Sequence, residues 1–376
     1  MSLKNKKILI DCSTLSKGGG IQVAIATISS IIKNNSQYQY KFVIPKSIIN
    51  FLPEKIRSQR NILWISKDGI LKKIKLVFQL YFIYFEYKPD IVYTIFGPAY
   101  FKAFCMHIVG FAKPYLIYPV IKENQNIKNY LKNILEIIFF KFSDFYIVET
   151  NTVKTRLKKI LKCNDERIFI IENGVNPELK RFSKSINEKI NNKKANKILV
   201  PSTFYPHKNL KVIIPITNYL LKYKKNFSFI LTIDEDDFKN NFNIKNQNLK
   251  KFIINIGPQK LSKLAEYYMD ADIIFLPTLL ECSTAVYPEA FFFKKPLITS
   301  NLDFAKELCR SAAIYCDPRD YKNCANNILL LLNDQNLKNK LVSEGEKQLK
   351  NYLNDSKRFV KLQSVFKKIL NSRLLI

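Results

Sequence analysis

The sequence predicts an α/β protein built from two Rossmann-like, doubly wound domains that face a cleft. Short apolar runs alternate along the chain with segments of helical apolar spacing, which is typical of a parallel sheet with helices on both faces. This series occurs twice, once on each side of a polar, charged segment at 183–197. A chain of 376 residues is also long for a single hydrophobic core, so two domains are expected.

The N-terminal domain is expected at residues 1–180. Strand-like apolar runs within it lie at 6–11, 40–45, 89–96, 106–112, 145–150 and 167–174. Helical apolar spacing occurs at 21–32 and 128–142. The glycines of Gly18–Gly20 come between the first strand and the first helix, so a turn is expected there.

The C-terminal domain is expected at residues 195–352. Its strand-like runs lie at 197–202, 227–233, 252–257, 271–277 and 296–300. Helices are expected at 209–224, 261–270, 286–294, 303–309 and 320–333. The last stretch, 353–376, has helical spacing from Asp355 to Leu370, and we expect this helix to pack back toward the N-terminal domain.

The expected architecture also indicates where a ligand would bind. In doubly wound sheets, ligands lie beyond the carboxyl ends of the strands, where the strand order reverses. The Gly18–Gly20 turn and the stretch "ECSTAVYPEA" at 281–290 both lie at strand-to-helix junctions. We therefore expect both to line a cleft between the domains.

The formal net charge of the chain is +30. A field of this sign attracts polyanions such as nucleic acid, anionic lipid or phosphorylated small molecules. Lysines that simply occupy solvated surface positions also explain much of the excess. Charge alone therefore does not choose among these partners.

Cysteine and histidine usage argues against a metal site. The seven Cys include no C-x-x-C pair and there are only two His, so we expect no zinc and no other metal cofactor. An odd Cys count without a framework fits a reducing cytosol. The most apolar segment, 76–85, is far shorter than the ~20 residues of a membrane-spanning helix. The protein is expected in the cytoplasm.

The stretch at 281–290 contains two carboxylates, Glu281 and Glu289, at the start of an expected helix. Ser283 or Thr284 is available as N-cap. The free N–H groups of the first turn, at Thr284, Ala285 and Val286, would suit a phosphate or sugar oxygen. The carboxylates would suit a part of the ligand that carries two neighbouring hydroxyls, because each carboxylate offers two acceptor oxygens. The alternative is a pair of ordinary glutamates favoured by the helix dipole.

Several segments of the second half together resemble the family 4 retaining glycosyltransferases of the GT-B fold. The stretch "LPTLLECSTAVYPEAFFFKKPLITSNLDFAKEL" at 276–308 resembles the family's pair of glutamates, with seven residues between them, and the strand that follows. Four more segments match in order: "IENGVN" at 171–176, "YPHKNL" at 205–210, "NIGPQKLSKLAEYYMDADIIFLP" at 255–277 and "AAIYCDP" at 312–318. The first domain matches only in outline.

This resemblance implies roles for individual residues. Glu289 would bind the ribose hydroxyls of a UDP- or GDP-linked sugar, and Glu281 would lie beside the donor sugar as the catalytic glutamate. Lys208 would neutralise the diphosphate without a metal. Gly19 and Gly20 would let the backbone approach a ligand closely, although a plain tight turn explains them almost as well.

The chain also departs from the family pattern. Thr203 stands near the place where many members have Arg, and Cys282-Ser283-Thr284 replaces the usual Gly-Phe-Gly. Many members have a His at the end of a first-domain strand, whereas His107 stands at the start of one. We therefore expect His107 to be structural and assign it only a small chance of an acceptor or catalytic role.

The resemblance implies sugar transfer to a saccharide or lipid-linked acceptor in bacterial surface-polysaccharide assembly. The stretches 70–88 and 129–143 mix Lys with Phe, Tyr and Leu. Burial is the commoner explanation, but docking on the inner face of an anionic membrane is a second hypothesis. Two alternatives stay open: a catalytically weak or inactive GT-B scaffold, and a basic nucleic-acid-binding protein without a readable module. A nucleotide-sugar epimerase lacks support, because the sequence offers no matching set of acid and base carboxylates.

Overall fold

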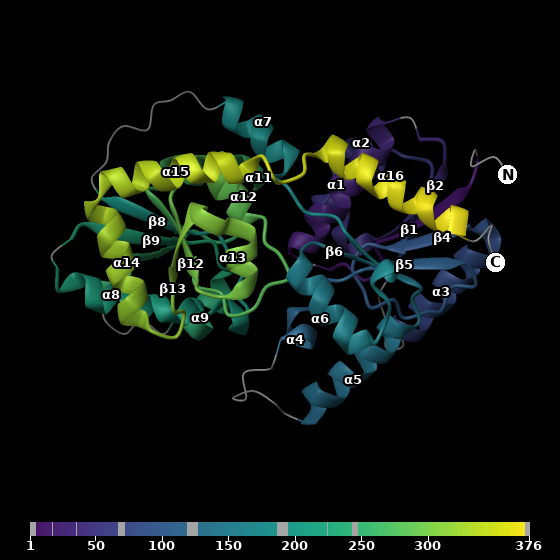
Figure 1. Ribbon diagram of the computed structural model, residues 1–376, viewed down its shortest axis with the longest axis horizontal. Coiled ribbons are helices and arrows are strands. Elements are labelled where there is room, and N and C mark those ends of the chain that lie inside the picture. Colours follow the sequence, from purple (N-terminus) through teal and green to yellow (C-terminus); the bar gives the residue numbers. More distant parts are fainter. Residues whose placement is uncertain are drawn as a thin grey trace. The chain divides into compact units, whose positions relative to one another are not determined.

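The computed structural model describes residues 5–16, 18–34, 36–66, 72–118, 127–185, 195–223, 225–242 and 247–372. The chain divides into two compact units, Met1–Asn173 with Leu353–Ile376, and Gly174–Tyr352. We call them the N-terminal unit and the C-terminal unit. Each contains one parallel sheet flanked by helices (Figure 1), so the predicted α/β class with two doubly wound sheets is confirmed.

The N-terminal unit has a seven-stranded sheet of order β3-β2-β1-β4-β5-β6-β7. Its strands are β1 (Lys7–Asp11), β2 (Gln39–Pro45), β3 (Ile62–Ile65), β4 (Ile91–Thr94), β5 (Met106–Gly110), β6 (Phe145–Val148) and β7 (Ile168–Ile170). Strand order reverses between β1 and β4, so the loops that follow these strands are neighbours at the carboxyl edge. The strand β3, at the edge of the sheet, was not predicted from the sequence.

Most helices of this unit connect successive strands, and the last one follows the C-terminal unit in the sequence. They are α1 (Gly19–Lys33), α2 (Glu54–Arg57), α3 (Lys72–Tyr87), α4 (Pro114–Ile117), α5 (Ile127–Lys141), α6 (Asn151–Leu161) and α16 (Asp355–Ser372), with 3-10 turns η1 (Lys46–Phe51) and η3 (Asp165–Arg167). The helix α6 has a clear start signal, because the Thr150 hydroxyl accepts the Val153 N–H.

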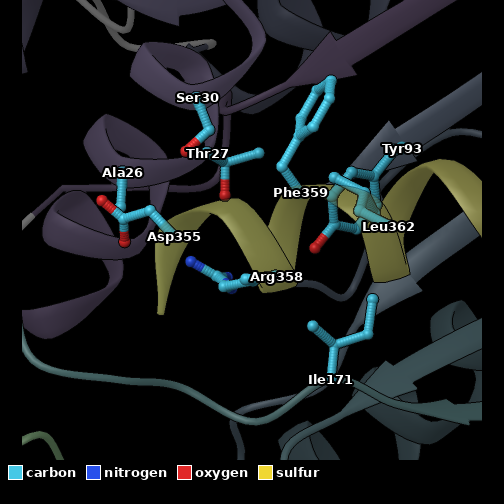
Figure 2. Close-up of a pocket in the computed structure, with 9 residues that line it drawn as sticks. All are labelled: Ala26, Thr27, Ser30, Tyr93, Ile171, Asp355, Arg358, Phe359 and Leu362. Carbon is cyan, nitrogen blue, oxygen red and sulfur yellow. The ribbon is translucent and has the colours of Figure 1, made fainter. Parts of the chain in front are cut away.

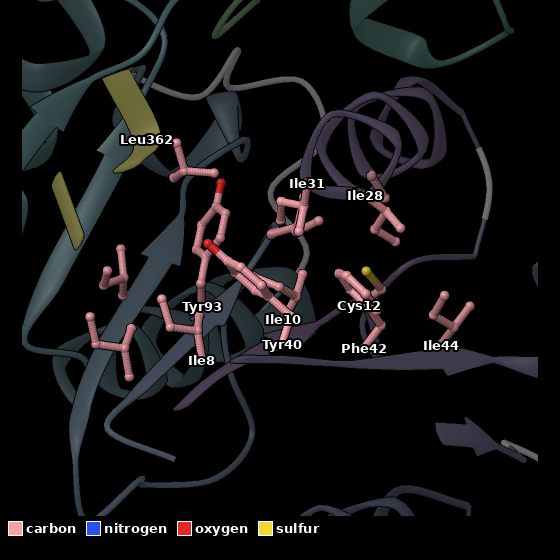
Figure 3. Close-up of a cluster of buried hydrophobic side chains, with 14 of the residues drawn as sticks. Ile8, Ile10, Cys12, Ile28, Ile31, Tyr40, Phe42, Ile44, Tyr93 and Leu362 are labelled. Carbon is pink, nitrogen blue, oxygen red and sulfur yellow. The ribbon is translucent and has the colours of Figure 1, made fainter. Parts of the chain in front are cut away.

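One face of this sheet packs against α1 and α16. Alternate residues of a strand share a face, and Ile8 and Ile10 of β1 lie in one buried cluster with Ile28 of α1 and Leu362 of α16 (Figure 3). Figure 1 shows α16, in yellow, alongside α1. The end of the chain thus completes the core of the N-terminal unit.

The C-terminal unit has a six-stranded sheet of order β10-β9-β8-β11-β12-β13. Its strands are β8 (Asn196–Val200), β9 (Phe227–Leu231), β10 (Ile253–Asn255), β11 (Ile273–Leu276), β12 (Leu297–Ser300) and β13 (Ala313–Cys316). Here the order reverses between β8 and β11, which pair directly. Five of these strands match predicted strand-like runs, and β13 was not predicted.

The helices of the C-terminal unit cover its sheet. They are α7 (Pro177–Ser185), α8 (Ile213–Leu221), α9 (Glu235–Asn241), α10 (Gln247–Lys250), α11 (Leu261–Asp270), α12 (Val286–Phe292), α13 (Asp303–Cys309), α14 (Tyr321–Asn333) and α15 (Gln335–Leu349), with 3-10 turns η4 (Pro206–Lys208), η5 (Leu210–Val212) and η6 (Arg310–Ala312). The expected linker at 183–197 falls largely outside the described residues, and its first part belongs to α7.

The helix expected at 209–224 begins later than its apolar spacing indicates. Asn209 has φ 56°, in the left-handed region, which interrupts a right-handed helix. The chain therefore makes one 3-10 turn before Asn209 and another after it, and α8 begins only at Ile213. This interruption matters because the first of these turns ends at Lys208.

Candidate functional site

Lys208 and Glu281 form an ion pair in the C-terminal unit. They lie in the loops after β8 and β11, the two paired strands between which the strand order reverses. Nζ of Lys208 donates to Oε1 of Glu281, and the two side chains are only 15% and 7% exposed. Because both charges are largely withdrawn from water, each depends on the other for compensation. The structure thus joins two of the predicted site residues.

The loop that contains Lys208 is fixed on both of its sides. The carbonyl oxygen of His207 accepts the N–H of Leu279 at 2.7 Å and the hydroxyl of Thr278 at 3.2 Å. After Lys208, Nδ2 of Asn209 donates to the carbonyl oxygen of Pro318 at 2.6 Å. These bonds hold the backbone on either side of the lysine, so its amine is presented to the loop after β11.

Glu289 lies on α12 and is buried. The hydroxyl of Tyr268, on α11, donates to Oε2 of Glu289 at 2.7 Å. The pKa of Glu289 is raised to about 7, because burial disfavours the carboxylate, and the Tyr268 hydrogen bond acts in the opposite direction. Glu289 is therefore a carboxyl group that titrates near neutral pH, held in one orientation by a tyrosine.

The start of α12 differs from the expectation. The N-cap is Ala285, with helical dihedral angles, and not Ser283 or Thr284. The Thr284 hydroxyl accepts the N–H of Val286 at 3.3 Å, so it satisfies one free donor of the first turn from the residue that precedes the N-cap. The helix itself ends at Phe292, two residues before the expected end.

Thr203 and His207 lie in the same loop as Lys208. Thr203, which follows β8, is exposed. The His207 ring stacks on Tyr205 with centroids 5.6 Å apart. Burial and the neighbouring Lys208 charge lower the pKa of His207 to about 4. The imidazole is therefore neutral at physiological pH.

Gly19 and Gly20 belong to the N-terminal unit, where they begin α1. Gly18 has φ 78°, which favours glycine. A Cβ on Gly20 would lie 3.1 Å from Leu15 and 3.3 Å from Phe96, whereas one on Gly19 would meet nothing within 4 Å. Gly20 is thus explained by packing within the unit, and Gly19 leaves open space beside the backbone.

His107 lies on β5 in the interior of the N-terminal unit and is 0% exposed. Its Nε2 is 3.1 Å from the Thr94 hydroxyl, which donates to Oδ2 of Asp11 at 2.9 Å. Burial lowers the pKa of His107 to about 3. The ring is therefore a neutral member of a buried polar chain that leads to the end of β1.

A pocket in the N-terminal unit contains none of the predicted site residues. It lies mainly between α1 and α16 (Figure 2) and is lined by Ala26, Thr27, Ser30, Tyr93, Ile171, Asp355, Arg358, Phe359 and Leu362. Its charged side chains, Asp355 and Arg358, both come from α16. Across the described ranges, no group of three or more His, Cys, Asp or Glu side chains is placed to hold a metal ion.

Two residues that support the site, Tyr268 and Tyr287, are not among those predicted from the sequence. Tyr268 follows the buried Ala265 by three residues on α11, a spacing that places both on the inner face, and a buried tyrosine hydroxyl needs a partner. Tyr287 forms a 2.8 Å hydrogen bond with Thr299, which donates to the Leu276 carbonyl. These two hydrogen bonds hold α12 against β11 and β12. They could not be predicted from the sequence, because they depend on which strands are neighbours in the sheet.

Comparison with known proteins finds a family match within the C-terminal unit. Residues 182–348 match the family model described as glycosyl transferases group 1. The C-terminal unit therefore carries a glycosyl transferase group 1 domain, and the chain is an enzyme of the glycosyltransferase class. No curated protein matches the sequence.

Solved structures share the fold over nearly the whole chain. Sucrose-phosphate synthase from Thermosynechococcus elongatus is similar with a TM-score of 0.76 at 13% identity, over 98% of this chain and 100% of that one. HepE from Anabaena, in complex with UDP and glucose, gives 0.75 at 14%, over 97% and 100%. A glycosyltransferase from Rickettsia africae gives 0.69 at 19%, over 97% and 99%. At these identities the likeness shows the fold, which is GT-B.

Proposed function

We propose that the protein transfers a sugar from a nucleoside-diphosphate sugar to a saccharide or lipid-linked acceptor, with retention of anomeric configuration. The observation that carries the proposal is the pairing of Lys208 with Glu281 inside the domain that matches group 1 glycosyl transferases. The similar HepE structure contains UDP and glucose, which supports a donor of this class. The glutamate spacing at 276–308 supports a retaining mechanism of the family 4 kind.

Lys208 would bind the donor diphosphate. Departure of the nucleoside diphosphate builds negative charge on its oxygens, and a positioned ammonium stabilises that charge more strongly as it grows. The ammonium has three N–H donors, and the ion pair with Glu281 uses one of them. The remaining donors can meet phosphate oxygens while the ion pair with Glu281 orients the amine.

Glu289 would accept the ribose hydroxyls. Tyr268 donates to Oε2, so Oε1 and the remaining lone pair of Oε2 are left for a vicinal diol. The ionised carboxylate accepts a hydrogen bond from each hydroxyl, whereas the protonated acid would offer one donor in place of an acceptor. Donor binding through this residue therefore requires Glu289 to be ionised.

Glu281 would lie beside the donor sugar, where Cys282-Ser283-Thr284 follows it. Cys282 is 4% exposed, whereas Ser283 and Thr284 are half-buried. Their hydroxyls stand where the family usually has Gly-Phe-Gly. We propose that these side chains contribute to the choice of donor sugar.

We place the reaction in the cytoplasm at the surface of an anionic membrane, in bacterial surface-polysaccharide assembly. The net charge of +30 supports attraction to such a surface. Within the described part of the chain, no helix combines the length and apolar character needed to cross a bilayer. The membrane association that we propose is peripheral.

Calorimetry with UDP- and GDP-sugars tests the donor assignment. We expect Glu289→Gln to weaken donor binding at least about tenfold, the loss of one or two hydrogen bonds to a charged group. Glu281→Gln should bind donor with little change and lose turnover. NMR of the initially formed product shows whether the transferred sugar keeps the anomeric configuration of the donor. Unchanged donor affinity in Glu289→Gln would remove the ribose assignment.

A donor-binding scaffold without turnover is a second candidate. Thr203 stands exposed where many family members have Arg, and His107 is enclosed in the N-terminal unit. Such a protein would bind nucleoside diphosphate but release none from a nucleotide sugar. Assay of nucleoside diphosphate release over a panel of donors and acceptors separates the two candidates.

A further inference from the structure

The helix α3 leaves aromatic side chains uncovered on the N-terminal unit. Phe78, Phe82 and Phe85 recur with helical spacing and are 71%, 71% and 57% exposed. Phe104, from the segment after β4, is 67% exposed, and its ring centroid lies 5.9 Å from that of Phe85. Single exposed apolar residues are ordinary, but a contiguous aromatic cluster indicates an interaction surface.

The helix α5 is also apolar on its outer side. Its exposed apolar residues follow helical spacing and are Ile127, Tyr130, Leu131, Ile134, Leu135 and Ile138. Its inner side carries Phe140 and the buried Glu136. Nζ of Lys113 donates to Oε1 of Glu136 at 3.1 Å, and the Tyr115 hydroxyl donates to Oε2 of Glu136 at 3.2 Å. The second half of α5 is therefore anchored to the unit, and the first half is presented to solvent.

The segment between β4 and β5 connects these two helices. Tyr81 of α3 packs on Phe101 with ring centroids 5.7 Å apart, and Tyr100 packs on Phe139 of α5 at 5.4 Å. Because Tyr100 and Phe101 are consecutive, α3 and α5 flank one short segment of the same unit (Figure 1). We call the exposed apolar residues of α3, α5 and Phe104 the α3–α5 surface.

The elements that carry this surface also carry exposed lysines. The exposed lysines on or next to its elements are Lys75, Lys88, Lys102, Lys128, Lys132 and Lys141. Among the described side chains of α3, α5 and the segment 98–104, the exposed acid is Glu86. Aromatic and aliphatic side chains interleaved with lysines are the composition of surfaces that lie in the headgroup region of anionic bilayers.

We propose that the α3–α5 surface docks the N-terminal unit onto an anionic phospholipid bilayer. The apolar side chains enter the boundary between headgroups and acyl chains, about 5–10 Å deep for such helices, while the lysines meet lipid phosphates. A second copy of the chain fits less well, because its own lysines would oppose these. The inference rests on the membrane location given above and not on the transfer reaction.

Sedimentation of the full chain with vesicles tests the inference. We expect binding to phosphatidylcholine vesicles that contain phosphatidylglycerol, weak binding to phosphatidylcholine alone, and loss of binding at high salt. Phe78→Ser/Phe82→Ser should weaken binding at least about tenfold. The control Phe51→Ser, at a 57% exposed phenylalanine outside the surface, should bind like the wild type. Unchanged melting temperatures exclude unfolding as the cause.

A second pair of variants separates the surface from net charge. Lys75→Glu/Lys102→Glu should weaken binding at least about 25-fold, since each lysine near anionic lipid contributes about fivefold. Lys306→Glu/Lys357→Glu changes the net charge equally at exposed lysines elsewhere and should bind nearly as the wild type does. Equal losses in the two double variants would overturn the inference, as would a dimer that Phe78→Ser/Phe82→Ser dissociates. A wild type that binds no vesicle would overturn the membrane location too, while donor turnover in solution still reports on the transfer reaction.

Discussion

The Tyr268 hydroxyl donates a 2.7 Å hydrogen bond to Oε2 of Glu289, and this pair lies inside the C-terminal unit. The tyrosine fixes the carboxylate plane and stabilises its ionised form, while burial raises its pKa to about 7. The pair thus places a titratable acceptor at the position proposed for ribose.

Stability should depend on pH through Glu289. Its pKa is raised from 4.5 to about 7 in the folded protein, so the folded state holds the proton more tightly than the unfolded state. The contribution of Glu289 to the free energy of unfolding is fully present below about pH 4.5. It is lost as the pH rises toward about 7, by up to about 3 kcal/mol. Glu289→Gln should flatten this fall, which urea unfolding of both proteins across that range measures. Parallel pH profiles would contradict it.

Donor affinity should show the opposite dependence on pH. Binding through the ionised Glu289 should strengthen as pH rises through about 7, and Tyr268→Phe should move this transition to higher pH because it removes a bond that favours the carboxylate. The same variant should cost about 1–2 kcal/mol of stability, as expected for a lost buried hydrogen bond. Calorimetry with the donor at several pH values measures the shift. An unmoved transition would assign the titration to another group.

The ion pair of Lys208 and Glu281 should show coupling in a double-mutant cycle. Lys208→Met or Glu281→Gln alone leaves one mostly buried group without its partner, and we expect Lys208→Met to cost about 3 kcal/mol. The double variant should regain part of this stability but no turnover, because the diphosphate still lacks its cation. Thermal unfolding and turnover are measured on all four proteins. Additive losses of stability would argue against the pairing.

Gly19 and Gly20 form a matched pair for alanine substitution. Gly20→Ala should destabilise by about 1 kcal/mol, because its Cβ meets Leu15 and Phe96 at 3.1 and 3.3 Å. Gly19→Ala meets nothing within 4 Å and should leave the melting temperature unchanged or raised. If the backbone at Gly19 approaches a ligand, this variant should instead raise the KM for donor or acceptor. Steady-state kinetics and thermal unfolding of both variants separate an effect on KM from an effect on stability. Equal effects of the two alanine substitutions would contradict the different roles assigned to Gly19 and Gly20.

Much of the fold could be predicted because strand and helix periodicities are local. The apolar runs located β8 and β11, and the glutamate spacing located Glu281 and Glu289. The predicted helix boundaries near Lys208 and Ser283 were less accurate. The left-handed conformation of Asn209 and the N-cap at Ala285 depend on contacts between loops, such as the hydrogen bond from Asn209 to Pro318. Periodicity carries no information about these contacts.

The sequence alone determined that the chain forms two α/β domains and which carboxylates and lysine are candidates for binding a nucleotide sugar. Only the tertiary structure decided that Lys208 meets Glu281, because adjacency of β8 and β11 brings residues 73 positions apart together. It also decided that the apolar stretches of α3 and α5 are exposed in part, although burial was the commoner expectation. Apolar spacing shows that a helix has an apolar face, but the packing of neighbouring elements decides whether that face is covered.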